Sequence, residues 1–242
     1  MLVKVLLVDV NPKMIGAWRN TFEGNPEVEI VHGSMLDQPV SAWVTPTNSA
    51  ARMDGGLDLV IKNCLGSQIE RAVQAQVKQR YAGSMPVGHA VVVPTGRPQP
   101  RFLISTPTMV GSSDNIGATM NVALACAAAF QAAHWQNTEE PGSIRSIALP
   151  GLGAQTGRVP VEICADLMWT AYDLFREHAF RDFAQMRQAL ERLLGDLSPK
   201  DSHKREAAPA LASMGVTPSK PTLGGANEDF DAADLDDFDD RD

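Results

Sequence analysis

The chain contains few aromatic residues and few cysteines. Only 6% of its 242 residues are Phe, Trp or Tyr, which argues against an aromatic platform on which nucleic-acid bases would stack. The three cysteines, Cys64, Cys126 and Cys164, form no Cys-x-x-Cys pair and no Cys/His cluster, so we predict no metal site. Two of them lie in apolar helical patterns, as buried reduced thiols do in a reducing cytoplasm.

Most of the chain also lacks net charge. Residues 226–242 contain nine acidic residues and one Arg, and this segment accounts for the whole net charge of -8. Residues 1–225 therefore offer no net basic field to nucleic acid, and we do not expect direct binding of DNA or RNA. The alternative is a local basic patch on the surface, which a net charge of zero does not exclude.

Long uninterrupted apolar runs are absent as well. The apolar start of the chain is broken by Lys4 and Asp9 and has no cleavage site, so we interpret it as a buried strand and not as a signal peptide. The Ala-rich run 118–133 contains Asn121 and Gln131 and is too short to span a bilayer. We therefore predict a cytoplasmic protein without a membrane partner.

The pattern that is present alternates between strands and helices. With 44% hydrophobic residues, the chain can build one substantial core. The alternation predicts an α/β fold with helices on both faces of a mixed or mainly parallel sheet. Strands are expected at 2–8, 28–31, 40–44, 89–94, 101–106 and 144–149, and helices at 14–22, 56–65, 68–81, 118–134, 161–177 and 180–194.

The end of this periodicity sets the predicted domain boundaries. Residues 1–195 form the predicted domain. Residues 196–225 are rich in Pro, Ser, Lys and Ala, the composition of a flexible linker. Residues 226–242 are too acidic to build a core, so we predict a disordered acidic tail.

The stretch 44–66 combines a strand end, a loop of small residues and a helix that begins near Gly56. The paired glycines Gly55 and Gly56 let the backbone approach a ligand closely, and the free N–H groups at the start of the helix favour an anion. Asn48 and Asp58, which lie on either side of the glycines, are able to act on a sugar. The simpler interpretation is an ordinary strand–loop–helix connection.

A second glycine loop follows the predicted strand 144–149. Its sequence, Gly151-Leu-Gly-Ala-Gln-Thr-Gly157, offers backbone N–H groups that could surround a phosphate. In an open α/β sheet, ligands bind beyond the carboxyl ends of the strands, where both loops are expected. The two loops together predict a cleft for a phosphate-bridged nucleotide, although a sharp turn can require glycine for steric reasons alone.

These segments resemble the macro domain family, whose members bind ADP-ribose. The resemblance covers roughly residues 1–178. The N-terminal segment and the Pro-Gly-Leu-Gly form of the second loop resemble a macro-like branch found in bacteria and their phages. This implies that the protein acts in a bacterial or phage-infected host cytoplasm. It also implies a three-layer α/β/α fold with a mixed central sheet. The matching segments are Leu7–Asn11 with Ala17-Trp18, Thr45–Asn48, Asp54–Asp58, Pro86–Gly96 and Pro150–Gly157.

The resemblance implies that the partner is ADP-ribose, or a macromolecule that carries an ADP-ribosyl group. Asn48 would bind ribose hydroxyls, and Asp58 would orient or deprotonate the water that attacks an ADP-ribosyl or O-acyl-ADP-ribose bond. No cofactor is implied. The expected ligand-binding residues are Ser34, Met35, Asn48, Gly55, Gly56, Leu57, Gly151, Leu152, Gly153, Ala154, Gln155, Thr156 and Gly157.

The chain departs from the family pattern at three places. Thr45 replaces the first Asn of the loop, and Ser34 replaces the acid that recognises adenine, for which Asp9 and Asp37 are the candidate substitutes. In the second loop the pair 154–155 is Ala-Gln in place of Thr-Gly. These changes favour a binding module without turnover, whereas the retained pair Asn48 and Asp58 favours hydrolysis.

Both members of that pair also have structural interpretations. A loop Asn such as Asn48 can hydrogen-bond its own backbone, and Asp58 can stabilise the N-terminus of its helix. A dinucleotide-dependent oxidoreductase is a further alternative, because Gly151-x-Gly153-x-x-x-Gly157 nearly matches the Rossmann fingerprint. That fingerprint normally lies in the first βαβ unit, however, and here it follows the last predicted strand.

The acidic tail suggests a function of its own. Phe230, Leu235 and Phe238 alternate with carboxylates, a pattern suited to a basic, partly apolar groove on a protein partner. It resembles the acidic tails by which single-stranded-DNA-binding proteins recruit partners. The alternative is a tail that serves only solubility.

Overall fold

The computed structural model describes residue 2, residues 4–177 and residues 183–194. Within this part of the chain, six strands form one sheet in the order β2-β1-β6-β3-β5-β4. All neighbouring strands are parallel except β4, which runs antiparallel to β5. The strands are β1 (Lys4–Asp9), β2 (Val28–His32), β3 (Ala42–Asn48), β4 (Val91–Pro94), β5 (Phe102–Met109) and β6 (Ser146–Leu149).

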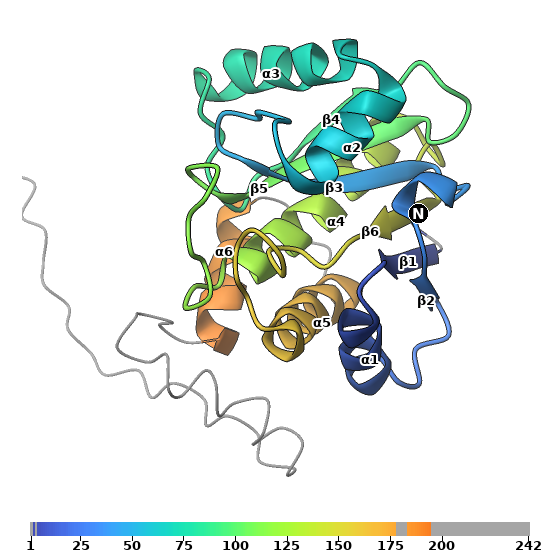
Figure 1. Ribbon diagram of the computed structural model, residues 1–242, viewed down its shortest axis with the longest axis vertical. Helices are drawn as coiled ribbons and strands as arrows, with labels where there is room; N and C mark the ends of the chain where they lie inside the picture. Colours follow the sequence, from blue (N-terminus) through green and yellow to red (C-terminus); the bar gives the residue numbers. More distant parts are fainter. Residues whose placement is uncertain (1, 3, 178–182, 195–242) are drawn as a thin grey trace, which may run out of the picture.

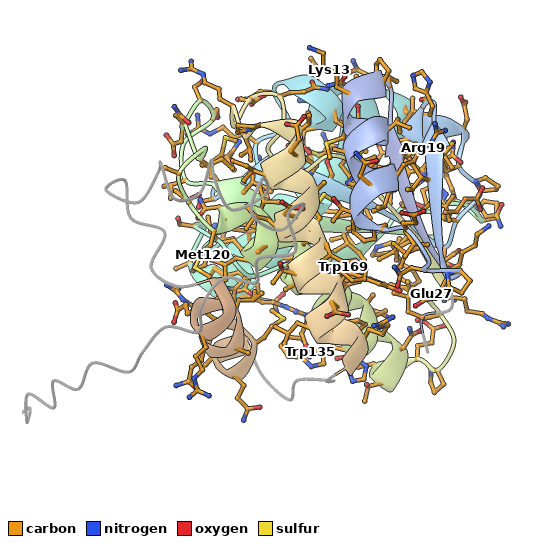
Figure 2. The ribbon with its side chains drawn as sticks, turned by 90° about the horizontal axis from the view of Figure 1, so that it is seen from below. Lys13, Arg19, Glu27, Met120, Trp135 and Trp169 are labelled. Carbon is orange, nitrogen blue, oxygen red and sulfur yellow. The ribbon has the colours of Figure 1, made fainter. Side chains whose placement is uncertain are left out.

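Helices cover both faces of the sheet, as Figure 1 shows. One layer contains α2 and α3, and the other contains α1, α4, α5 and α6, with α5 packed between α1 and α4 (Figure 2). The predicted three-layer α/β/α fold with a mixed sheet is therefore confirmed. The helices are α1 (Pro12–Thr21), the short 3₁₀ helix η1 (Met35–Asp37), α2 (Gly56–Leu65), α3 (Gln68–Tyr81), α4 (Asn121–Glu139), α5 (Val161–Glu177) and α6 (Phe183–Leu194).

Alternation along the strands divides the interior into two cores. In β1, Val5 and Leu7 pack with the α1, α4 and α5 layer, whereas Leu6 and Val8 pack with the α2 and α3 layer. This is the period of two that places successive side chains on opposite faces of a sheet. The Ala-rich helix α4 is buried around most of its circumference, because small side chains let it lie between β5, α5 and α6.

Several predicted boundaries hold, and others differ: the helix predicted at 118–134 is α4 at Asn121–Glu139, and the strand predicted at 101–106 extends to Met109. The helices predicted at 56–65, 68–81 and 161–177 have these bounds. The strand predicted to end at Val44 continues as β3 through Asn48, although it contains Pro46. On its β6 side, β3 is paired only at Ala42 and Trp43. Proline is tolerated farther along because the strand there has become an edge on that side.

The predicted linker 196–225 and acidic tail 226–242 lie outside the described residues. Within the described part of the chain, no helix has the length and apolar character needed to cross a membrane.

Candidate functional site

A cleft of about 490 Å³ lies at the carboxyl ends of β1, β3, β5 and β6. This volume is within the range of roughly 300–1,000 Å³ typical of ligand pockets. One end, here called the apolar end, is lined by Val8, Val10 and Met35. The other, the polar end, is lined by Asn48, Thr108 and Ser112, and the two glycine loops lie along the cleft between them.

The N-terminus of α2 brings free backbone donors to the cleft. Gly55 is the N-cap and supplies no side-chain hydrogen bond to the helix. The first backbone bond of the helix runs from Leu59 N to Gly55 O, so the amides of residues 56–58 have no acceptor among the described residues. Gly56 has a φ of +55°, a conformation that favours glycine. An uncapped helix start of this kind attracts anions.

The second glycine loop faces this helix start across the cleft. The amides of Gly153, Gln155, Thr156 and Gly157 donate to no acceptor in the described part of the chain. A Cβ added at Gly56 would lie 3.9 Å from Thr156 Oγ1, so the two loops approach each other closely. Unpaired N–H groups from two segments therefore border one cavity, and such groups require water or a ligand as acceptor.

Glycine in the second loop also meets a packing requirement. A Cβ added at Gly157 would lie 2.7 Å from the backbone oxygen of Gly153. A Cβ added at Gly153, which has a φ of +74°, would lie 2.8 Å from Ile116 Cδ1. The steric interpretation of these glycines therefore holds alongside their contribution of free amides.

Asn48 uses its whole side-chain amide within the protein. Its Oδ1 accepts from Ala50 N at 3.1 Å and from Arg52 N at 3.2 Å. Its Nδ2 donates to Arg52 O at 3.0 Å and to Ser112 Oγ at 3.3 Å. An amide has two acceptor sites and two donor hydrogens, so all four are engaged. In this arrangement Asn48 holds the loop 49–53 in place, and a ligand hydroxyl would have to displace one of these partners.

Asp58 lies in the first turn of α2 and is nearly buried, with 6% of its surface exposed. Thr45 donates a hydrogen bond to its Oδ1, while the hydroxyl of Thr47 faces the same carboxyl without a hydrogen bond of standard geometry. Burial raises the pKa of Asp58 to about 7, the two threonine hydroxyls oppose this shift, and the charges of Asp54 and Glu70 add to it. The carboxyl can therefore gain or lose a proton near neutral pH.

At the apolar end, Ser34 and Met35 both line the cleft. The Ser34 hydroxyl caps η1 by accepting from Leu36 N at 3.1 Å. Of the two carboxylates considered as replacements for the adenine-recognising acid, Asp9 lines the cleft and Asp37 does not. Asp9 accepts from Asn11 N at 2.8 Å and from Gly151 N at 3.2 Å, so it also positions the second glycine loop.

Eleven of the thirteen expected ligand-binding residues line the cleft, and two do not. Leu152 is completely buried in the core, and Ala154 packs against that core. Arg52, Asp54, Thr108 and Ser112 line the cleft but were missed by sequence reasoning. Thr108 and Ser112 could have been found from their position at the carboxyl end of a predicted strand, the edge where α/β proteins bind ligands.

The described residues contain no group of three or more His, Cys, Asp or Glu that could hold a metal ion. The strand order β2-β1-β6-β3-β5-β4 also differs from the 3-2-1-4-5-6 order of the dinucleotide-binding Rossmann fold. In addition, the glycine loop follows β6, the last strand of the described chain, and not the first strand as in that fold. The geometry therefore gives no support to the oxidoreductase alternative.

Comparison with known proteins gives the family. An uncharacterized protein of Aquifex aeolicus is 30% identical over 146 residues, which is 59% of this chain and 78% of that protein. The macrodomain of Mycobacterium tuberculosis DarG is 22% identical with a TM-score of 0.49, over 60% of this chain and 87% of that chain. The Oceanobacillus iheyensis macrodomain with ADP is 19% identical with a TM-score of 0.49, over 67% and 88%. The sequence profile described as Macro domain matches residues 44–168, more than half of the chain, and the chain therefore belongs to the macro domain family.

Proposed function

We propose that the cleft binds ADP-ribose, or an ADP-ribosyl group attached to a macromolecule. The observation that supports this most directly is the meeting of two sets of unpaired backbone amides, at the start of α2 and in the loop 151–157, across one cavity. A diphosphate is a ligand that such amides favour, because they supply several hydrogen-bond donors and a positive helix end.

The two ends of the cleft suit the two other parts of the ligand. The apolar end offers side chains on which an adenine ring can lie, because the faces of a base are apolar. The polar end offers the hydroxyl residues Thr108 and Ser112 for the distal ribose, and the Asn48 amide where a ribose hydroxyl displaces one of its present partners. In this orientation Asp9, which follows Val8 in the lining of the apolar end, is the candidate carboxylate for recognition of the base.

Calorimetric titration of the full chain with ADP-ribose, AMP and NAD tests the proposal. We expect ADP-ribose to bind more tightly than AMP, because AMP lacks the diphosphate and the distal ribose. The test variant is Gly55→Glu, since the site of an added Cβ is open and the φ of -159° is extended backbone that any residue adopts. A carboxylate there opposes the diphosphate and should weaken binding by about tenfold or more.

The matched control is Gly16→Glu. Gly16 lies on an exposed position of α1, is absent from the cleft lining, and has no atom within 4 Å of an added Cβ. It makes the same change of charge without touching the site. Binding that is equally weak in both variants, or absent in the unmodified chain, would contradict the proposal.

A second candidate is hydrolysis of a bond at the distal ribose, and the position and pKa of Asp58 favour it. A carboxyl that lines the cleft with a pKa of about 7 is suited to proton transfer near neutral pH. Asp58→Asn should abolish release of acetate from O-acetyl-ADP-ribose and of ADP-ribose from modified protein, with ADP-ribose affinity retained. If Asp58→Asn still hydrolyses these substrates, the role of this carboxyl is structural and not catalytic.

A further inference from the structure

The cleft is lined by a single cationic residue. Among the described lining residues Arg52 is the only Lys, Arg or His. Its side chain is exposed and forms no ion pair or hydrogen bond with the part of the chain that the structure describes. A guanidinium is always charged and presents a planar fork of donors that fits a phosphate or a carboxylate. Arg52 is therefore available to an anion on the ligand.

The backbone that carries Arg52 is fixed from several directions. Its neighbours Ala51 and Met53 are buried, with 0% and 1% of their surfaces exposed. The Asn48 amide bonds both the N–H and the C=O of Arg52. Met53 N donates to Glu70 Oε1 at 2.8 Å, which ties the loop to α3. The backbone at Arg52 is thus held in place while its cationic side chain is exposed. A backbone that is already ordered reduces the entropy lost on binding.

Arg52 belongs to the polar end of the cleft. Asn48 Nδ2 donates to Arg52 O and also to Ser112 Oγ, so the backbone of Arg52 adjoins the amide and the hydroxyl. If the distal ribose occupies this end, the long side chain of Arg52, which also lines the cleft, can reach a group that this ribose carries. The free backbone amides that suit the diphosphate lie elsewhere, along the two glycine loops.

We propose that Arg52 is a specificity-determining residue that selects ADP-ribosyl ligands with a second anionic group, phosphate or carboxylate, beside the distal ribose. This inference rests on the proposed function and extends it to the group on the far side of the ribose. Asp54 also lines the cleft, is exposed and forms no ion pair among the described residues. Its charge opposes the same anion and limits the gain that Arg52 provides.

The experiment is calorimetric titration of the full chain with matched ligands. One pair is ADP-ribose and ADP-ribose 1″-phosphate. The other is a peptide ADP-ribosylated on serine, with either Asp or Asn next to that serine. We expect the added anion to tighten binding by about five- to tenfold in at least one pair. Arg52→Gln should abolish this gain, measured as the ratio of the two affinities within each pair, and Asp54→Asn should enlarge it.

Arg158→Gln is the control for a general charge effect. Arg158 is exposed, lies next to Gly157 in the second glycine loop and is absent from the cleft lining. A gain that persists in Arg158→Gln and disappears in Arg52→Gln supports the inference, and the pair that shows it identifies the source of the anion. A gain retained in Arg52→Gln, or no gain in either pair, overturns it while leaving ADP-ribose binding intact. Failure of the unmodified chain to bind ADP-ribose would refute the proposed function itself.

Discussion

Replacement of Asp58 by Asn should change how the stability of the protein depends on pH. In the unfolded chain this carboxyl ionises near its ordinary pKa of 3.8, whereas burial raises the pKa in the folded state to about 7. Between these values the folded state holds a proton that the unfolded state has lost. Stability therefore falls as pH rises through this window, and the contribution is fully present only below the lower value.

The difference between the two pKa values sets the size of the effect. Each pKa unit corresponds to about 1.4 kcal/mol, so the full window amounts to about 4 kcal/mol in the free energy of unfolding. Asp58 is only 6% exposed, so solvent screening reduces this value little. Asn has nearly the same shape and can still accept from Thr45 through its Oδ1, but it has no proton to lose.

Urea unfolding of the wild-type chain and Asp58→Asn across this pH range measures the effect. The quantity of interest is the difference between the two unfolding free energies at each pH, in which the other titrating groups cancel. We expect wild type to lose up to about 4 kcal/mol relative to Asp58→Asn between acid and neutral pH. Thr45→Val removes a donor that favours the ionised form, so it should extend the window to higher pH. A difference that is constant with pH would refute the reasoning.

Three further predictions concern the loops and the tail. Asn48→Ala removes four hydrogen bonds from the loop 49–53 and should cost about 2–4 kcal/mol in urea unfolding; a loss near zero would show that water replaces them. Gly157→Ala places a methyl group against Gly153 O and should cost about 1–3 kcal/mol, whereas Gly16→Ala in exposed α1 should stabilise the protein. Deletion of 226–242 should leave ADP-ribose affinity in calorimetry unchanged, and a large loss would show that the tail contributes to binding.

The sequence predicted those parts of the site that depend on local chemistry. Paired glycines before a helical pattern located the start of α2 at Gly56, and the strand before Gly151 located the second loop. Both loops were expected at carboxyl ends of strands, and both border the cleft. A strand–loop–helix connection positions its cleft-facing amides through its own backbone, so little knowledge of the rest of the fold was needed.

Features that depend on distant partners could not be predicted. The extension of β3 through Asn48 requires pairing with β5, and Pro46 locally signals a break. The full use of the Asn48 amide depends on Ser112, which is 64 residues away in the chain. Arg52 is exposed between the buried residues Ala51 and Met53, and the sequence of this loop does not reveal which of its side chains face the core. These are tertiary effects, and local propensity has no information about them.

The position of β6 has a consequence for how the protein is made on the ribosome. β6 is the last strand of the described chain, yet it lies inside the sheet and joins β1 to β3. Asp9 and Ser34 stand on one side of that junction, and Asn48 and Arg52 on the other. A nascent chain that has not yet exposed Ser146–Leu149 therefore has two unconnected halves of the cleft. Any ligand that contacts both sides of the cleft can stabilise only a domain in which β6 has joined the sheet.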